Sequence, residues 1–174
     1  MNKKLILIAI ALTAMVSCKE TKSPFTRDVD NYAVVTIQAP DLSGITDNGK
    51  EVLNLYRFAA DEVDAIYWEQ YFGDKQVLLD GITDPVQKTF AEINYGPWDR
   101  TTGKSFVEGY ADALPGAGFY PADMTKDEFD AWDNPDKNSP YTLVRRAPDG
   151  SLEAVWYHDA YKAHIDRIGN YLKA

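Results

Sequence analysis

The segment from Asp47 to Gly73, "DNGKEVLNLYRFAADEVDAIYWEQYFG", decides the fold class because it is long and periodic. Its apolar residues recur at the three- and four-residue spacing that places side chains on one face of a helix. They are Val52, Leu55, Tyr56, Ala59, Val63, Ile66 and Tyr67. Asp47 or Asn48 can cap the start of the helix, and Gly73 can close it. We therefore predict a helix between these ends with one buried stripe.

Four carboxylates of this segment, Asp61, Glu62, Asp64 and Glu69, fall mostly on the opposite side of the predicted helix. We interpret them as a solvated face, and the alternative is a carboxylate metal site. The whole chain is acidic, with 27 Asp and Glu against 18 Lys and Arg and a net charge of −9. Binding of nucleic acid through a basic face is therefore not expected.

Three further features lie between Tyr32 and Asp123. The segment Tyr32 to Gln38, "YAVVTIQ", is rich in β-branched residues and predicts a strand. Asp84-Pro85 combines an N-cap with proline at the first helical position, so it starts a second helix, which must stop before Gly96-Pro97. A long irregular stretch from Tyr95 to Asp123 follows, and loops of this length are usually functional or packed by their own side chains.

The last fifty residues predict two helices and a hairpin. Thr125 to Glu128, "TKDE", is a capping box that starts a short helix. "YTLVRR" and "SLEAVWY" predict a β-hairpin that turns at Pro148-Asp149-Gly150. A final helix from about Asp159 has an apolar stripe at Tyr161, Ile165, Ile168 and Leu172. The predicted fold is mainly α with a small β component (α+β): helices, one C-terminal β-hairpin and a long aromatic loop.

The N-terminus predicts export. "MNKK" is a positive region, and the twelve-residue apolar run "LILIAIALTAMV" is shorter than the roughly 20 residues that span a bilayer. Met15-Val16-Ser17-Cys18 resembles a bacterial lipobox, in which the cysteine becomes the lipidated first residue of the mature protein. Cys18 is also the single cysteine, so an unpaired thiol or an intermolecular disulfide is the alternative.

These features divide the chain into three parts. Residues 1–17 are the expected lipoprotein signal peptide, and residues 18–31 are the lipidated cysteine with a polar tether. Residues 32–174 are long enough for one domain with its own core, and a composition of 45% hydrophobic residues is that of a globular protein. The expected location is the bacterial cell envelope, on a leaflet that the sequence does not identify.

Two segments of the irregular stretch, "INYGPWDR" at 93–100 and "GFYPADMT" at 118–125, are dense in aromatic residues, glycine and proline. Tyr and Trp offer large apolar faces, and Asp99, Arg100 and Asp123 could bind peptide backbone or a chain terminus. Such segments suit the wall of a groove that receives an extended ligand. The alternative is that the aromatic rings only pack the loop onto the helices, with Asp99 and Arg100 paired together or capping helix ends.

No catalytic constellation is recognisable from spacing. His158 and His164 are six residues apart, which leaves them about 120° from a common helical face, whereas zinc-binding pairs return to one face. We expect His158 to help start the last helix and His164 to be partly exposed. The chain has no GxSxG elbow, no phosphate-binding glycine loop and no HExxH motif.

Several long motifs in fixed order are similar to the dipeptidyl-peptidase III-like zinc metallopeptidases, in the branch of exported bacterial lipoproteins. They are "DAIYWEQYFGDKQVLLDGI", "INYGPWDR", "GAGFYPADMTKDEFDAW" and "YTLVRRAPDGSLEAVWYHDAY". The resemblance runs from about Leu42 to the C-terminus. It departs from the family at Gly118, where relatives usually read "GANFYP", and in the segment after Arg100, which is shortened.

The resemblance implies an N-terminal, largely helical part that flanks the substrate cleft. Members of the family are longer and hold zinc on an HExxGH helix with a distant glutamate, all C-terminal to the matched region, so no zinc ligand or catalytic residue carries over. Zinc therefore belongs to the full-length family, and no cofactor is expected in this chain. The residues that match the family motifs, and that become candidates for peptide binding or cleft packing, are Tyr95, Trp98, Asp99, Arg100, Phe119, Tyr120 and Asp123.

Three hypotheses follow. The first is the N-terminal part of a membrane-anchored zinc peptidase, inactive alone, with an apolar face on the C-terminal helix that docks to the missing C-terminal part or to a partner protein. The second is a free-standing lipoprotein that binds peptides or a protein partner without catalysis. The third, an independent hydrolase, has the least support because no catalytic motif is present.

Overall fold

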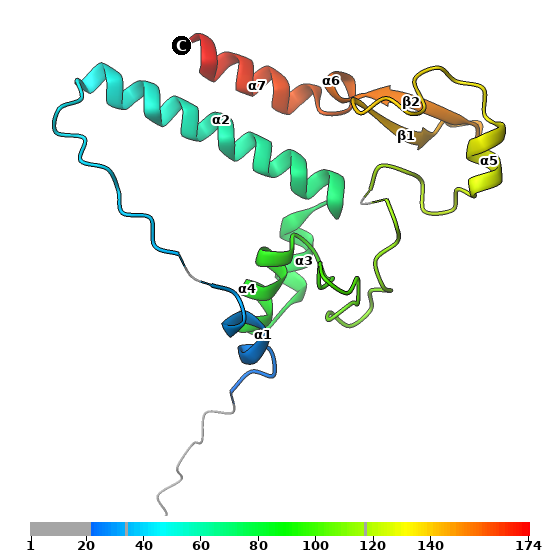
Figure 1. Ribbon diagram of the computed structural model, residues 1–174, viewed down its shortest axis with the longest axis horizontal. Coiled ribbons are helices and arrows are strands. Elements are labelled where there is room, and N and C mark those ends of the chain that lie inside the picture. Colours follow the sequence, from blue (N-terminus) through cyan, green and yellow to red (C-terminus); the bar gives the residue numbers. More distant parts are fainter. Residues whose placement is uncertain (1–21, 34, 117) are drawn as a thin grey trace, which may run out of the picture.

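The computed structural model describes residues 22–33, 35–116 and 118–174 and combines helices with one small sheet (Figure 1). The helices are α1 (Thr26–Asp30), α2 (Asp47–Tyr71), α3 (Lys75–Gly81), α4 (Pro85–Asn94), α5 (Lys126–Ala131), α6 (Tyr157–Ala160) and α7 (Lys162–Lys173). The strands β1 (Thr142–Arg146) and β2 (Leu152–Trp156) pair antiparallel, with Thr142 opposite Trp156. The predicted mainly α fold with a small β component is confirmed.

Local capping signals place most helix starts. Asp84 caps α4 and Thr125 caps α5, each through side-chain oxygens that accept backbone N–H groups. The long helix α2 is also confirmed, but its cap is Thr46 and neither Asp47 nor Asn48. Thr46 has extended backbone dihedrals and its hydroxyl accepts a backbone hydrogen bond, so it meets the geometry of a cap, whereas both predicted caps already lie within the helix.

The two longest helices form a pair. Figure 1 shows α2 and α7 running side by side in opposite directions, with the β1–β2 hairpin and α5 beyond the start of α7. The rings of Phe58 on α2 and Tyr171 on α7 have centroids 5.5 Å apart. One turn further along α2, Glu62 binds His164 and Arg167 of α7. The pair therefore combines an apolar contact with a charged one.

The main core lies at the C-terminal end of α2. Trp68 is 3% exposed there and packs with buried residues of α3 and α4 and with Ile82. Phe106 and Val107, from the irregular stretch, pack against the same cluster. A second buried group at the hairpin includes Leu143 and Val144. Because the irregular stretch covers the main core, its position relative to the last turns of α2 is fixed.

The predicted strand at Tyr32–Gln38 is wrong. The described residues of this segment form no strand, and Val35 and Ile37 are exposed. β-Branched residues favour an extended backbone, but a strand also needs a neighbour that accepts its hydrogen bonds. In the part of the chain that the structure describes, β1 and β2 pair with each other and not with this segment.

The buried stripe predicted for α2 is only partly confirmed. Ala59 is buried, whereas Val52, Tyr56 and Val63 are exposed, Tyr56 to 58%. The contact with α7 runs along an adjacent face of α2, through Phe58 and its neighbours. The spacing thus identified the helix but did not identify the face that is covered.

Helices α1 and α3 were not predicted, and the final helix predicted from about Asp159 is divided at Tyr161 into α6 and α7. Helix α1 lies within the segment that we interpreted as a tether, and the ring of Phe25 beside it stacks on Phe90 of α4 at 6.3 Å. The predicted signal peptide and Cys18 lie outside the described residues. Among the described residues, none of the helices has the length and apolar character needed to cross a membrane.

Candidate functional site

The irregular stretch begins at Tyr95, which ends α4 in the left-handed conformation with a φ of 57°. Its hydroxyl donates to the Asp64 carboxylate at 2.6 Å, and its ring packs edge-on to Tyr67 at 4.7 Å. The hydrogen bond to Asp64, with burial as a second cause, raises the pKa of Tyr95. Tyr95 therefore ties the start of the stretch to α2.

Trp98 holds the next turn. Its indole N–H donates to the carbonyl of Ala111 at 2.7 Å, and its ring meets Tyr71 and Phe72 edge-on at 5.8 Å each. Trp98 also pairs with Ser105 in an isolated antiparallel bridge. Two parts of the stretch, 97–105 and 110–113, are thus joined to each other and to the end of α2.

Asp99 and Arg100 are bound separately. The Asp99 carboxylate accepts hydrogen bonds from Thr101 and Thr102, chiefly from the Thr101 side chain, and these hold its pKa below the usual value. The Arg100 guanidinium donates to the Tyr67 hydroxyl and lies 5.5 Å from the centre of that ring. Neither predicted alternative, an Asp99–Arg100 pair or caps on helix ends, describes these two residues.

The other candidates lie at the far end of the stretch. The Phe119 carbonyl accepts a hydrogen bond from the backbone N–H of Val144 at 2.8 Å, beside the outer edge of β1. Asp123 pairs with Arg146 at 3.0 Å, and that hydrogen bond lowers the pKa of Asp123. The same guanidinium also binds Glu128 of α5. Phe119 and Asp123 therefore fasten the stretch to the hairpin and α5.

A groove of about 630 Å³ lies between these two attachment points, and we call it the aromatic groove. Its lining residues are Tyr71, Trp98, Tyr110, Ala111, Asp112, Ala113, Leu114, Pro115, Gly118, Tyr120, Pro121, Ala122 and Met124. Two of the seven sequence candidates, Trp98 and Tyr120, therefore line the groove, and the other five are not among its lining residues. Tyr71, Tyr110 and Leu114 were missed, although the loop around "GYADALPG" is itself rich in small and apolar residues.

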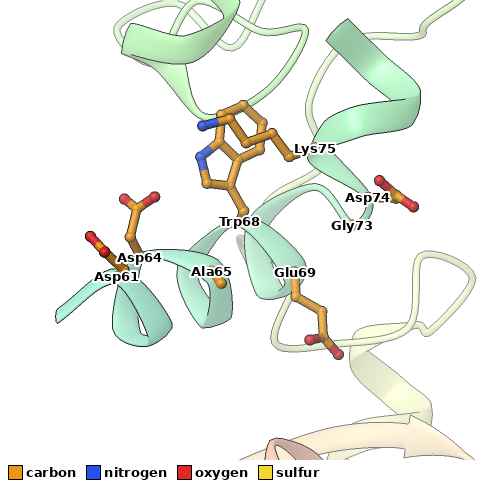
Figure 2. A pocket seen from close by; sticks show the side chains of 8 residues that line it. All are labelled: Asp61, Asp64, Ala65, Trp68, Glu69, Gly73, Asp74 and Lys75. Atoms are coloured by element: carbon orange, nitrogen blue, oxygen red, sulfur yellow. The ribbon is translucent and has the colours of Figure 1, made fainter. Parts of the chain in front are cut away.

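A second pocket, of about 460 Å³, lies along the C-terminal half of α2 (Figure 2). Figure 2 shows Asp61 and Asp64 close together at one end, with Glu69 and Asp74 directed elsewhere and Lys75 lying across the Trp68 ring. The carboxylates therefore do not converge on one point. Among the described residues, no group of three or more His, Cys, Asp or Glu side chains is placed to hold a metal ion.

The two histidines have different surroundings. His158 is largely exposed and lies near Asp159. His164 is 19% exposed, with Nδ1 at 2.7 Å from Glu62 and Nε2 at 3.3 Å from Glu69. Both of these carboxylates come from α2, so Glu62 and Glu69 serve the helix pair and are not simply a solvated face.

A comparison with solved structures relates this geometry to a known protein. The structure of dipeptidyl-peptidase III from Corallococcus sp. strain EGB matches with a TM-score of 0.72 and 26% sequence identity, over 84% of this chain and 30% of that chain. This chain has a dipeptidyl-peptidase III-like fold. It therefore spans less than a third of the length of that dipeptidyl-peptidase III. No family model matches the chain, and no curated protein matches it.

Proposed function

We propose that this chain is the N-terminal, cleft-flanking part of an envelope-anchored dipeptidyl-peptidase III-like peptidase. The observation that carries the proposal is the match to dipeptidyl-peptidase III over 84% of this chain and 30% of the other, because it relates most of this chain to a minor part of a larger enzyme. The long motifs from "DAIYWEQYFG" to "WYHDAY" support the same relationship.

In this proposal the chain contributes shape and contacts, and the peptidase reaction belongs to other residues. The family implies zinc, but the described residues do not fit a zinc site: the pocket carboxylates diverge, and His164 uses both ring nitrogens on α2 carboxylates. No step of the proposed function therefore passes through zinc in this chain.

The α2–α7 pair offers a surface for docking. Tyr56 and Val63 on α2 and Leu172 on α7 are each more than half exposed. Val52, Tyr56 and Leu172 line one small pocket of about 80 Å³, so exposed apolar residues of the two helices meet there. Exposed apolar faces of this kind mark interaction sites, and in this proposal the remainder of a peptidase covers it.

The first test is the intact mass of the native lipoprotein extracted from its own cells. The proposal predicts that residues 18–174 are recovered either within a much larger polypeptide or bound to a zinc-dependent peptidase. A lipidated chain of residues 18–174 that remains monomeric with no bound protein would contradict it. Replacing Cys18→Ala should abolish lipid labelling and release the protein from the membrane fraction.

A free-standing peptide-binding lipoprotein is the second candidate. The aromatic groove favours it, because an open pocket of about 630 Å³ with mainly apolar walls lies in the range of ligand sites. This candidate predicts saturable binding of peptides by the purified chain with no turnover.

A further inference from the structure

The aromatic groove is preformed by hydrogen bonds between its own walls. The Trp98 indole binds the Ala111 carbonyl, the Ala113 N–H binds the Gly103 carbonyl at 2.8 Å, and the Ser105 N–H binds the Asp112 carboxylate at 2.9 Å. These bonds hold the wall 110–113 against the turn 98–105. A ligand would therefore meet a shaped surface and would not have to order the loop.

Gly118 lets the opposite wall lie close to α2. Its φ is +75°, and a Cβ at this position would lie 1.8 Å from the Gln70 carbonyl oxygen. Any side chain at this position would meet that carbonyl and would require the loop to move away from α2. The width of this groove is therefore a property of this chain and its glycine.

The groove has apolar walls and little free charge. Leu114 is 59% exposed and Tyr120 is 42% exposed, so their side chains are accessible. Asp112 is the charged residue among the described groove-lining side chains, and Lys104 neutralises it at 2.6 Å. A ligand carboxylate or ammonium group would find no free charge to pair with in such a groove, and would lose hydration on entry.

The charged residues that the sequence offered for binding a chain terminus are already occupied. Asp99 closes a local turn, Arg100 lies over the Tyr67 ring, and Asp123 pairs with Arg146. None of the three lines the groove. The groove is therefore suited to the middle of a polypeptide and not to its end.

Tyrosine hydroxyls provide the groove's polar contacts. Tyr71, Tyr110 and Tyr120 all line the groove, and a tyrosine hydroxyl can donate to a ligand carbonyl. Proline-containing segments offer carbonyls without the N–H that would need an acceptor, and their rings pack on flat aromatic surfaces. Aromatic-lined grooves recognise such extended segments in other proteins.

From these observations we propose that the aromatic groove binds an uncharged, proline-containing segment in the interior of an extended polypeptide. The inference rests on the proposed role of this chain in peptide handling. It adds that the groove binds the ligand polypeptide away from the ligand's termini, so the ligand needs no free amino group.

The test is titration of the full chain with the hexapeptide Pro-Leu-Pro-Pro-Leu-Pro, acetylated and amidated, followed by calorimetry. We expect saturable binding, with an affinity within about twofold of that of the same peptide with free ends. A blocked Gly-Ser hexapeptide should not bind. Binding only by the free-ended peptide, or no saturable binding of either at millimolar concentration, would overturn the inference.

Two variants localise the binding. Tyr120→Phe keeps the ring and removes one hydroxyl, so the affinity should fall about fivefold. Leu114→Ser removes an exposed apolar contact and should weaken binding about tenfold. The control is Val77→Ser on α3, which is 64% exposed and outside the groove, and it should leave binding unchanged. An equal loss in the control would also overturn the inference, and circular dichroism checks that each variant is folded.

The two proposals can fail separately. Binding of the blocked peptide by a chain whose native form is a lipidated monomer would keep the groove and remove the peptidase assignment. A large native mass without peptide binding would keep the peptidase assignment and remove the proposed ligand of the groove.

Discussion

Helix α2 and the irregular stretch 95–123 differ in how firmly they are packed, and the less regular backbone is the one with more attachments to the rest of the molecule. The helix leaves Tyr56 and Val63 more than half exposed. The irregular stretch buries Pro97, fastens its backbone to α4 and the hairpin, and binds α2 through side chains. A helix satisfies its own backbone hydrogen bonds and needs only one packed face. An irregular segment must find each partner elsewhere, so it persists only where specific side chains provide them.

The largest expected change in stability comes from a buried residue of α2, and an exposed residue of the same helix is its control. Trp68→Ala removes a side chain that is 3% exposed at the core, and it should lower the free energy of unfolding by about 3 to 5 kcal/mol. Val63→Ala, on the same helix, removes an exposed side chain and should change it by less than about 0.5 kcal/mol. Urea denaturation of both variants measures the difference. A large loss for Val63→Ala would mean that α2 is covered in solution.

The next prediction tests how the irregular stretch is held. Asn94 is fully buried, and its side-chain oxygen accepts the backbone N–H of Arg100 at 3.0 Å. Asn94→Ala leaves that N–H without its partner and should lower the free energy of unfolding by about 2 kcal/mol. Asn138→Ala, at an exposed position outside this stretch, is the control and should have little effect. Equal urea midpoints for the two variants would show that the stretch does not depend on Asn94.

A smaller effect is expected where the two long helices meet. Hydrogen bonding to Arg167, and secondarily to His164, holds the pKa of Glu62 below its usual value, and the Glu62 side chain is 16% exposed. A lowered folded-state pKa stabilises the protein above the ordinary carboxyl pKa of 4.5, and this contribution is lost as the pH falls through the folded value. Glu62→Gln should therefore cost about 1 to 2 kcal/mol at pH 7, and less near pH 3.

Unfolding free energies of wild type and Glu62→Gln, measured between pH 7 and pH 3, test whether the cost of the substitution falls with pH. The control is Asp61→Asn, whose partner Arg57 is 59% exposed, because exposed pairs on one helix contribute little. If the difference between wild type and Glu62→Gln grew toward low pH, the assigned role of Glu62 in the helix pair would be wrong.

Local signals explain what the sequence could predict. Asp84 and Thr125 start helices through contacts with N–H groups two or three residues away, and "PDG" turns the hairpin within its own few residues. Gly96-Pro97 stops α4 for an equally local reason. These elements were predicted correctly because the residues that decide them are neighbours in the sequence.

Partners far apart in the sequence explain what was missed. The face of α2 that is covered depends on α7, about one hundred residues later, and periodicity contains no information about that partner. The strand predicted at Tyr32–Gln38 fails because no strand among the described residues pairs with this segment. Trp98 and Tyr120, which line the groove, were identified from their residue types. The pairing of Asp123 with Arg146, outside the groove, could not be inferred from either residue alone.

The smallest expected effect compares a hydroxyl of the irregular stretch with one buried elsewhere in the molecule. Tyr161, at the junction of α6 and α7, is buried, its hydroxyl has no partner among the described residues, and burial raises its pKa to about 12. Tyr161→Phe should therefore leave stability unchanged or raise it by up to about 1 kcal/mol. Tyr95→Phe removes a bonded hydroxyl from the irregular stretch and should lower stability by about 1 kcal/mol. If side-chain hydrogen bonds, and not backbone regularity, hold the stretch, thermal unfolding should show a lower midpoint for Tyr95→Phe and an unchanged or higher midpoint for Tyr161→Phe. A destabilising Tyr161→Phe would show that its hydroxyl has a partner in solution.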